Sequence, residues 1–365
     1  MIPLIKPVQT VQSTGTTSLL GLALLAALLF ATIGGDSDAS ANNGVRGLDR
    51  AIAAQEAHNG NLLALDGVVG TGVGPGGSGS AVVFVLTESA DVAGIPSRLD
   101  GVTVIPTVTG KVTALHHRAN HDKGGGGSDP TPTPGPDPTP DPTPSDPTVR
   151  FDRPVPIGVS TGHPSITAGT IGARVTDGTN VFALSNNHVY ADENAAALGD
   201  AVIQPGSFDG GSSSADDIGT LSAFIPIAFD GSANTVDAAI ALSSEGQLGN
   251  ATLSAGYGTP DSTTVSATSR MKVQKYGRTT GFTKSRVWAT NVSVNVGYDS
   301  GTALFTGQIA VRGAGFSAGG DSGSLVVTQS GNNPVGLLFA GGGQYTFLNP
   351  IDDVLSAFGV TVDGK

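Results

Sequence analysis

Short apolar runs recur between about residue 150 and Phe347, and glycine, aspartate and asparagine separate them. Apolar runs of this length rich in β-branched residues are typical of strands, and the residues between them are typical of turns. The runs expected as strands are 171–175, 181–184, 202–204, 238–242, 292–296, 308–311 and 325–327. This spacing predicts a mostly β domain, made of two small antiparallel β-barrels with a cleft between them.

A helical pattern follows the last of these strands. Asn349 is expected to cap a C-terminal helix, Pro350 to take its first position and Gly359 to end it. Its apolar residues share one face, which suits packing on the second barrel: Ile351, Val354, Leu355 and Phe358.

The stretch from Gly47 to about Leu115 has a different order of elements. Helical spacing begins at Leu48 and continues to about Leu65. Strands are expected at 68–73 and 81–86, a turn or short helix at 95–99, and a strand pair within 102–115. We therefore predict a small α/β module, with residues 42–118 as its bounds.

The first 41 residues resemble an export signal. Lys6 is the one early cation, an apolar run extends from Leu19 to Ile33, and the small residues 39–41 offer a cleavage site. The run spans roughly 22 Å as a helix, less than the ~30 Å hydrocarbon core. Residues 1–41 are predicted to be a cleaved signal peptide of a secreted or cell-envelope protein, without stable membrane association afterwards. A permanent anchor is the alternative, because the polar segment before the cleavage site is long.

Low-complexity sequence separates the module from the β domain. Glycines from Gly124 are followed by Asp-Pro and Thr-Pro repeats up to Pro147. Such repeats favour polyproline II, and about 18 residues of it would reach roughly 55 Å. We interpret residues 119–149 as a linker, and residues 150–365 as a separately folded domain that is able to remain tethered.

Composition excludes several kinds of chemistry. The 365 residues contain no cysteine, so a thiol nucleophile, a cysteine metal site and disulfides are all impossible. The formal charge of −12 argues against nucleic acid or an anionic membrane as a partner.

No metal and no cofactor is expected. His116, His117 and His121 are clustered after the α/β module, where a solvated tail is expected and a metal site is the weaker alternative. The aspartates at 209, 216 and 217 suggest a surface loop, with calcium as the weaker alternative.

One hexapeptide, Gly-Gly-Asp-Ser-Gly-Ser at 319–324, suits a nucleophilic serine at Ser322. Paired glycines allow a tight bend in which successive N–H groups point to one place. A base and an acid precede it: His188 follows the apolar run at 181–184, and Asp237 opens the run at 238–242. Each residue alone is more often an ordinary loop, cap or surface residue, so the argument depends on the set.

The order His188, Asp237, Ser322, with gaps of about 50 and 85 residues, resembles that of bacterial chymotrypsin-like (trypsin-like) serine peptidases. Two further segments are similar to alpha-lytic-type members of this class: 273–281, which includes Gly-Arg-Thr-Thr-Gly, and 335–342 after the serine. An α/β-hydrolase is excluded, because its histidine would follow the serine, and no histidine follows His188.

The resemblance implies a His-Asp-Ser triad that hydrolyses peptide bonds through an acyl-enzyme, with protein or peptide substrates. His188 would be the general base, Asp237 would orient it, and the N–H groups of Gly320 and Ser322 would form the oxyanion hole. Because the imidazole must be neutral to accept a proton, activity is expected to rise with pH through about 6.5.

Asp321 lies beside the proposed oxyanion donors and needs a counter-charge. By the resemblance, this charge is expected from Arg278, as a structural ion pair. A plain surface position for Arg278 is the alternative.

Three residues are expected to bind substrate: Phe316, Phe339 and Gly341. Phe316 stands where the class builds the floor of its primary pocket, so an apolar or small side chain is favoured over Lys or Arg; a core position for Phe316 is equally open. Gly341 and the two glycines after it would form an open wall for the substrate backbone. Phe339 departs from the class, which usually has a serine there to support the acid, so that support must come from elsewhere.

Two questions remain open at this level. Alpha-lytic-type enzymes carry α/β pro-regions that chaperone or inhibit the protease, and we expect the N-terminal module to be such a propeptide, with a retained binding or inhibitory module as the alternative. The rival function is a catalytically inactive, peptidase-fold binding protein.

Overall fold

A computed structural model of the chain describes residues 45–115 and 146–365. The predicted signal peptide and most of the predicted linker lie outside these residues, and so do His116, His117 and His121. Among the residues described, no helix is long and apolar enough to cross a membrane.

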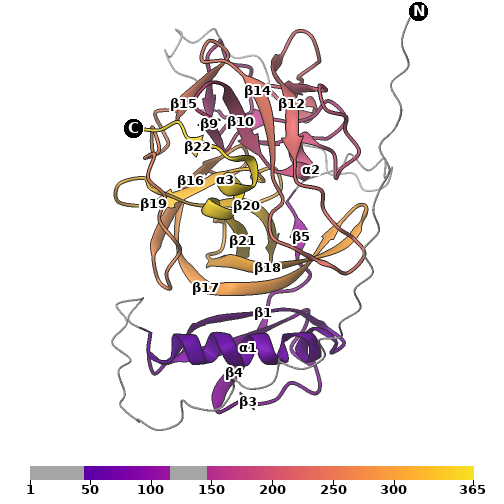
Figure 1. Ribbon diagram of the computed structural model, residues 1–365, viewed down its shortest axis with the longest axis vertical. Coiled ribbons are helices and arrows are strands. Elements are labelled where there is room, and N and C mark those ends of the chain that lie inside the picture. Colours follow the sequence, from indigo (N-terminus) through magenta and orange to yellow (C-terminus); the bar gives the residue numbers. More distant parts are fainter. Residues whose placement is uncertain (1–44, 116–145) are drawn as a thin grey trace, which may run out of the picture. The chain divides into compact units, whose positions relative to one another are not determined.

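The α/β module consists of one helix and five strands (Figure 1). They are α1 (Leu48–Leu63), β1 (Val68–Pro75), β2 (Ala81–Thr87), β3 (Arg98–Leu99), β4 (Val102–Val108) and β5 (Thr113–Ala114). Apolar residues of α1 and of β1, β2 and β4 form one core cluster. The expected helix and first two strands are confirmed. The expected strand pair is wrong, because β4 pairs with β2 in parallel, while β5 leaves the module to pair with β17 and β20.

The first half of the β domain is built on a six-stranded sheet in the order β11-β12-β14-β10-β9-β22. These strands are β9 (Ala173–Thr176), β10 (Val181–Ser185), β11 (Ala201–Ile203), β12 (Asp217–Phe224), β14 (Ala239–Ser243) and β22 (Thr361–Val362). Two short pairs accompany them: β7 (Ser160–Thr161) with β8 (Gly169–Thr170), and β6 (Val155–Ile157) with β15 (Leu248–Thr252). The helical turns are α2 (Asn187–Tyr190) and η1 (Ser207–Asp209).

The second half is a closed six-stranded barrel, since each strand pairs with the next around the circle. In that order the strands are β16 (Lys272–Gly277), β17 (Gly281–Tyr298), β18 (Gly301–Arg312), β21 (Tyr345–Pro350), β20 (Pro334–Gly342) and β19 (Leu325–Thr328). The short β13 (Ala233–Asn234) joins β18. The predicted two-barrel, mostly β architecture is therefore confirmed.

Helix α3 (Ile351–Phe358) ends at Gly359, whose positive φ of 64° suits a residue without Cβ. Its predicted start is wrong by one residue, because Pro350 is the N-cap. Asn349 does not cap the helix. Its side chain instead accepts a hydrogen bond from the Asp237 backbone N–H at 3.0 Å and donates one to Gln308 at 2.7 Å.

Strand β1 of the module continues the sheet of the second barrel by pairing antiparallel with β17. Glycines make this approach possible: a Cβ at Gly70 would lie 2.6 Å from the Ser293 carbonyl oxygen, and one at Gly74 equally close to that of Trp288. Side-chain hydrogen bonds between Gln55 of α1 and Asn291 of β17 add to the backbone pairing. The module is thus joined to the barrel by a shared sheet.

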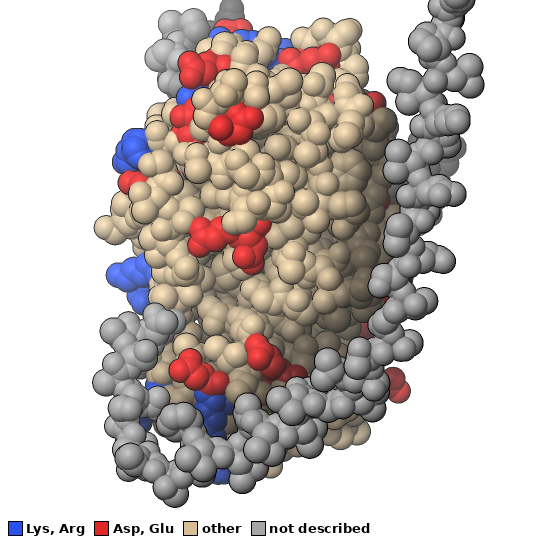
Figure 2. Space-filling view, viewed as in Figure 1, with Lys and Arg blue, Asp and Glu red and all other residues tan. Residues whose placement is uncertain are grey.

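Charged side chains are sparse on the surface. On the face in Figure 2, acidic residues are scattered among uncharged ones. The stability of this chain therefore depends mainly on its buried apolar clusters, where each fully buried large side chain contributes roughly 1.5–3 kcal/mol.

Candidate active site

The first barrel supplies a buried His–Asp pair. Strand β10 ends at Ser185, and the short helix α2 that follows carries His188. Its Nδ1 lies 2.5 Å from Oδ2 of Asp237, and its backbone N–H donates to Oδ1 at 3.2 Å. Both side chains are fully buried. A carboxylate held this way fixes the imidazole with Nδ1 as donor, which leaves Nε2 to act as a base.

Further residues hold Asp237 in place. The Asn186 side chain donates to the Asp237 carbonyl oxygen at 2.7 Å, and Asn349 accepts from its N–H. The Tyr298 hydroxyl donates to Oδ2 at 2.9 Å. Sequence reasoning missed Asn349 and Tyr298 in these roles. The one available signal for them was Phe339, which replaces the serine usual in the class and therefore implied that another residue hydrogen-bonds to the acid.

Ser322 lies between β18 and β19, in a loop where Gly320 and Gly323 have no room for a side chain. Gly320 and Gly323 have φ values of 93° and 91°. A Cβ at Gly323 would lie 2.1 Å from the Ser185 hydroxyl at the end of β10. The Thr170 N–H donates to the Ser322 carbonyl oxygen at 2.8 Å. These close contacts bring the serine loop of the second barrel against the strand end that leads to His188.

The expected Arg278–Asp321 ion pair is wrong. Asp321 is buried and accepts hydrogen bonds from the N–H groups of Thr279 and Thr280 at 2.9 and 3.1 Å, and from the Thr280 hydroxyl at 2.7 Å. Its counter-charge is Lys275, whose Nζ lies 3.4 Å from Oδ2, with both side chains fully buried. Burial lowers the pKa of Lys275, and Asp321 opposes that shift.

Arg278 points to a different acid. Its guanidinium forms two hydrogen bonds with Asp209, at 2.9 and 2.5 Å, and lies over the Phe208 ring. The physical reason is reach: Lys275 points into the barrel from β16, so it already occupies the space beside Asp321, whereas Arg278 follows the strand and extends to η1.

Residues 112–115 occupy the cleft along β20. Thr113 and Ala114 pair antiparallel with Gly341 and Ala340. The Leu115 N–H donates to the Phe339 carbonyl oxygen at 3.2 Å, and the Gly320 N–H donates to the Leu115 carbonyl oxygen at 2.7 Å. The segment therefore lies as an extra strand, and its last carbonyl meets the glycine that precedes Asp321 and Ser322.

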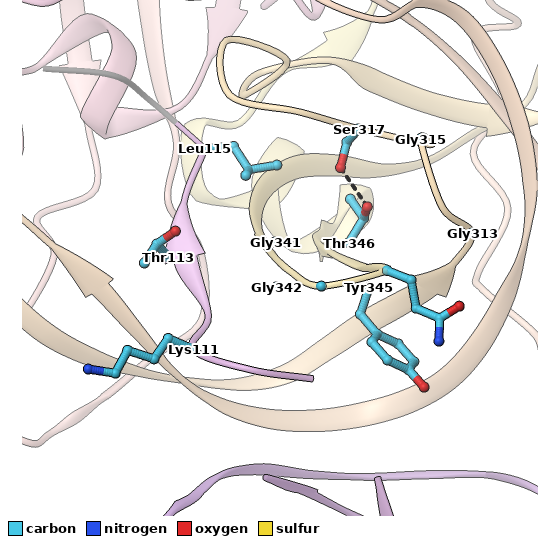
Figure 3. A pocket seen from close by; sticks show the side chains of 12 residues that line it. Lys111, Thr113, Leu115, Gly313, Gly315, Ser317, Gly341, Gly342, Tyr345 and Thr346 are labelled. Carbon is cyan, nitrogen blue, oxygen red and sulfur yellow. Dashed lines mark hydrogen bonds between the residues drawn. The ribbon is translucent and has the colours of Figure 1, made fainter. Parts of the chain in front are cut away.

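The Leu115 side chain lines a cavity of about 250 Å³ (Figure 3). A Cβ on Gly341 would lie 3.1 Å from a Leu115 methyl group, so a glycine there gives the leucine room. On another wall, the Ser317 and Thr346 hydroxyls hydrogen-bond at 2.6 Å. Other lining residues are Gly313, Gly315, Gly342, Gly343, Gln344, Tyr345, Thr113 and Lys111, the one charged residue of the set.

The pocket differs from the prediction at Phe316. Its side chain is buried among Val273, Val287 and other apolar residues of the barrel, so the alternative core position is the one observed. Its neighbours Gly315 and Ser317 line the cavity instead. The Phe339 side chain also packs in the core, 4.8 Å from Phe305 between ring centroids, and its backbone carbonyl accepts from the Leu115 N–H.

Among the described residues, no group of three or more His, Cys, Asp or Glu side chains is arranged to hold a metal ion. In the acidic loop, Asp209 pairs with Arg278 and Asp216 with Arg150. Hydrogen bonding to Arg150 lowers the pKa of Asp216. Two of the three aspartates are thus engaged with arginines, and the carboxylate of the third, Asp217, accepts from the Ser214 N–H at 3.0 Å.

Comparison with solved structures finds bacterial chymotrypsin-like serine proteases. Thermobifida fusca protease A is 21% identical with a TM-score of 0.41, and the match covers 58% of this chain and 100% of that one. Cellulomonas bogoriensis chymotrypsin is 20% identical (TM-score 0.40; 59% and 100% covered), and Nocardiopsis protease 17% identical (0.40; 57% and 99%). No protein-family profile and no curated protein matches the chain. Roles for individual residues of this chain are therefore inferred from the contacts that those residues make in its own structure.

Proposed function

We propose that the protein is an exported serine endopeptidase of the chymotrypsin type. The observation that carries this proposal is the Leu115 carbonyl, which accepts a hydrogen bond from the Gly320 N–H while its segment pairs with β20. A peptide carbonyl held beside a serine, within a strand pairing, is the arrangement that an acyl transfer from a peptide requires. The alternative function, an inactive binding protein, does not explain why His188 and Asp237 form a buried pair.

In the proposed reaction, the Ser322 hydroxyl oxygen attacks the carbonyl carbon and its proton passes to His188. The imidazolium then protonates the leaving nitrogen as the C–N bond breaks. Water then attacks the carbonyl carbon of the acyl-enzyme while His188 takes its proton, and the proton returns to Ser322 as the acyl C–O bond breaks. Asp237 stabilises the imidazolium, and the Gly320 N–H, with that of Ser322 as the second donor, stabilises the oxyanion at about 3–4 kcal/mol for one donor.

The cavity supports uncharged substrate side chains of leucine size. Its walls are glycines, hydroxyls and an amide, and the glycines at 341–343 leave the β20 edge open to a peptide backbone. A cationic side chain would lose its hydration there and would meet Lys111, the one charged residue of the lining, which has the same sign. Cleavage after apolar residues is therefore expected, rather than after Lys or Arg.

The module is proposed to be a propeptide whose own end is the first substrate. Cleavage after Leu115 would leave the linker on the peptidase, with residues 42–115 as the released or retained part. Until that segment leaves, it occupies the β20 edge and blocks other peptides. The module therefore acts as a built-in inhibitor, while the shared β1–β17 sheet supports the barrel.

Covalent labelling tests the proposed function. A fluorophosphonate should add one probe mass to the purified protein, and peptide mapping should place it on Ser322. The matched variant His188→Ala should not be labelled, because an unactivated serine does not react at a comparable rate. A properly folded, processed protein that takes no probe would establish the binding-protein reading.

Leu115→Lys is expected to slow cleavage after residue 115 by at least about 100-fold, because the ammonium would enter a pocket whose one charged lining residue, Lys111, carries the same sign. Intact mass over time measures the cut. Leu115→Met, which keeps an apolar side chain of similar size, is the control and should be cut at nearly the normal rate. Equal cleavage of the lysine variant at this bond would contradict the proposed pocket.

Arg278→Ala is expected to lower the free energy of unfolding by about 1–3 kcal/mol, because Asp209 loses its charged partner in a largely buried position. Labelling of Ser322 should remain near normal, since Asp321 keeps Lys275, Thr279 and Thr280. Chemical unfolding and labelling rates measure both, with the exposed Arg286→Ala as control. A large loss of labelling without a loss of stability would instead support a role for Arg278 in holding the oxyanion loop.

A further inference from the structure

The Asp237 carboxylate receives three hydrogen bonds although it is fully buried. Oδ1 accepts from the His188 backbone, while Oδ2 accepts from both His188 Nδ1 and the Tyr298 hydroxyl. A buried carboxylate depends on such donors, because no water replaces a missing one. The tyrosine hydroxyl therefore donates to the same carboxylate oxygen that orients the imidazole.

Tyr298 is held firmly at this position. It is the last residue of β17, and the turn that follows is bound by Glu193, whose carboxylate accepts from the N–H groups of Asp299 and Ser300 at 3.2 and 2.8 Å. On the other side, the Gly297 N–H donates to the Val112 carbonyl oxygen at 2.9 Å.

Aromatic packing fixes the ring itself. The Tyr298 ring meets those of Phe229 and His188 edge to face, at centroid distances of 5.7 and 5.9 Å. Burial and the neighbouring Asp237 raise the pKa of Tyr298 well above its ordinary value, so the hydroxyl keeps its proton and remains a donor.

Within the proposed peptidase function, we infer that Tyr298 is the positioning residue for the acid of the triad. Its hydroxyl fixes the rotation of the Asp237 carboxylate and takes up part of its negative charge. Phe339, on β20, has no donor to offer, so a hydroxyl from a different strand performs this task. Tyr298 acts through Asp237 and does not touch the substrate.

Tyr298→Phe removes the hydroxyl and keeps the ring, so the fold should persist. We expect kcat to fall by about 10- to 100-fold with little change in KM, which corresponds to one hydrogen bond to a charged group. The acid limb of the pH profile should also shift, because the oxygen that accepts from the imidazole has lost its second donor. Glu193 and Asp299 are other acids beside this group, and both are present in the wild type and in the variant.

The experiment compares the processed wild type, Tyr298→Phe and Tyr276→Phe by peptide hydrolysis and by the rate of fluorophosphonate labelling against pH. Tyr276 is a buried ring in a different apolar cluster from that of Tyr298, and its variant controls for the loss of a tyrosine hydroxyl. Thermal unfolding checks that all three fold, and the low-field proton resonance of His188 Nδ1–H reports the imidazole–carboxylate bond directly.

A lower kcat, a shifted acid limb and a displaced resonance in Tyr298→Phe alone would support the assignment. Wild-type kcat, pH midpoint and resonance in that variant would overturn it while the proposed function stands. A wild type that labels at no pH would overturn both the function and this role.

Discussion

Ser322→Ala is expected to reduce kcat by about a millionfold and to leave the chain uncut after Leu115. The alanine has no atom that could form the acyl-enzyme, so only the oxyanion donor and substrate positioning remain to accelerate hydrolysis. The structure has little reason to change, because the loop is held by the glycines and by the Asp321 contacts. Intact mass of the purified protein, with and without the fluorophosphonate, measures both consequences.

The exposed turn residue Ser330 provides a control for this experiment. Ser330→Ala keeps the loop and the site, so it should be labelled and processed as the wild type is. Persistent hydrolysis by Ser322→Ala, free of contaminating protease, would identify another nucleophile and would contradict the triad.

Lys275→Met is expected to destabilise the protein by about 3–5 kcal/mol, because it leaves the Asp321 charge buried without a counter-charge. Both side chains of the pair are fully buried, so water cannot replace the ammonium. The same change should lower the labelling rate of Ser322, since Asp321 accepts hydrogen bonds from Thr279 and Thr280 and from the Ala318 N–H of the serine loop. Chemical unfolding and labelling kinetics measure the two effects.

Lys272→Met changes an exposed lysine on the same strand and should shift stability by no more than about 0.5 kcal/mol. The double variant Lys275→Met with Asp321→Asn should recover part of the loss, because the uncompensated charge is gone. Equal stabilities of the two methionine variants would show that the buried pair contributes nothing.

The wrong predictions share one cause. Arg278 and Asp321 are 43 residues apart, and the resemblance assigned them to each other by motif alone. Lys275 belongs to the same segment, but whether it pairs with Asp321 depends on the direction in which its side chain points from β16. A buried charge selects its partner by distance in the folded chain, which spacing along the sequence does not give. The same holds for β5, whose apolar pattern fits pairing with β4 as well as with β20.

The sequence by itself determined the features that local rules control. Short apolar runs and the turn residues between them defined the strands of two barrels, helical spacing defined α1, and the glycines around Ser322 defined a tight bend. It also predicted His188 and Asp237 as a base and its acid from their order along the chain, and these two side chains lie in contact. Only the tertiary structure decided that Leu115 lies in the cleft, that Lys275 neutralises Asp321 and that Tyr298 supports Asp237. Each of these contacts joins segments distant in the chain, and such contacts form only when the packing of the whole domain brings the segments together.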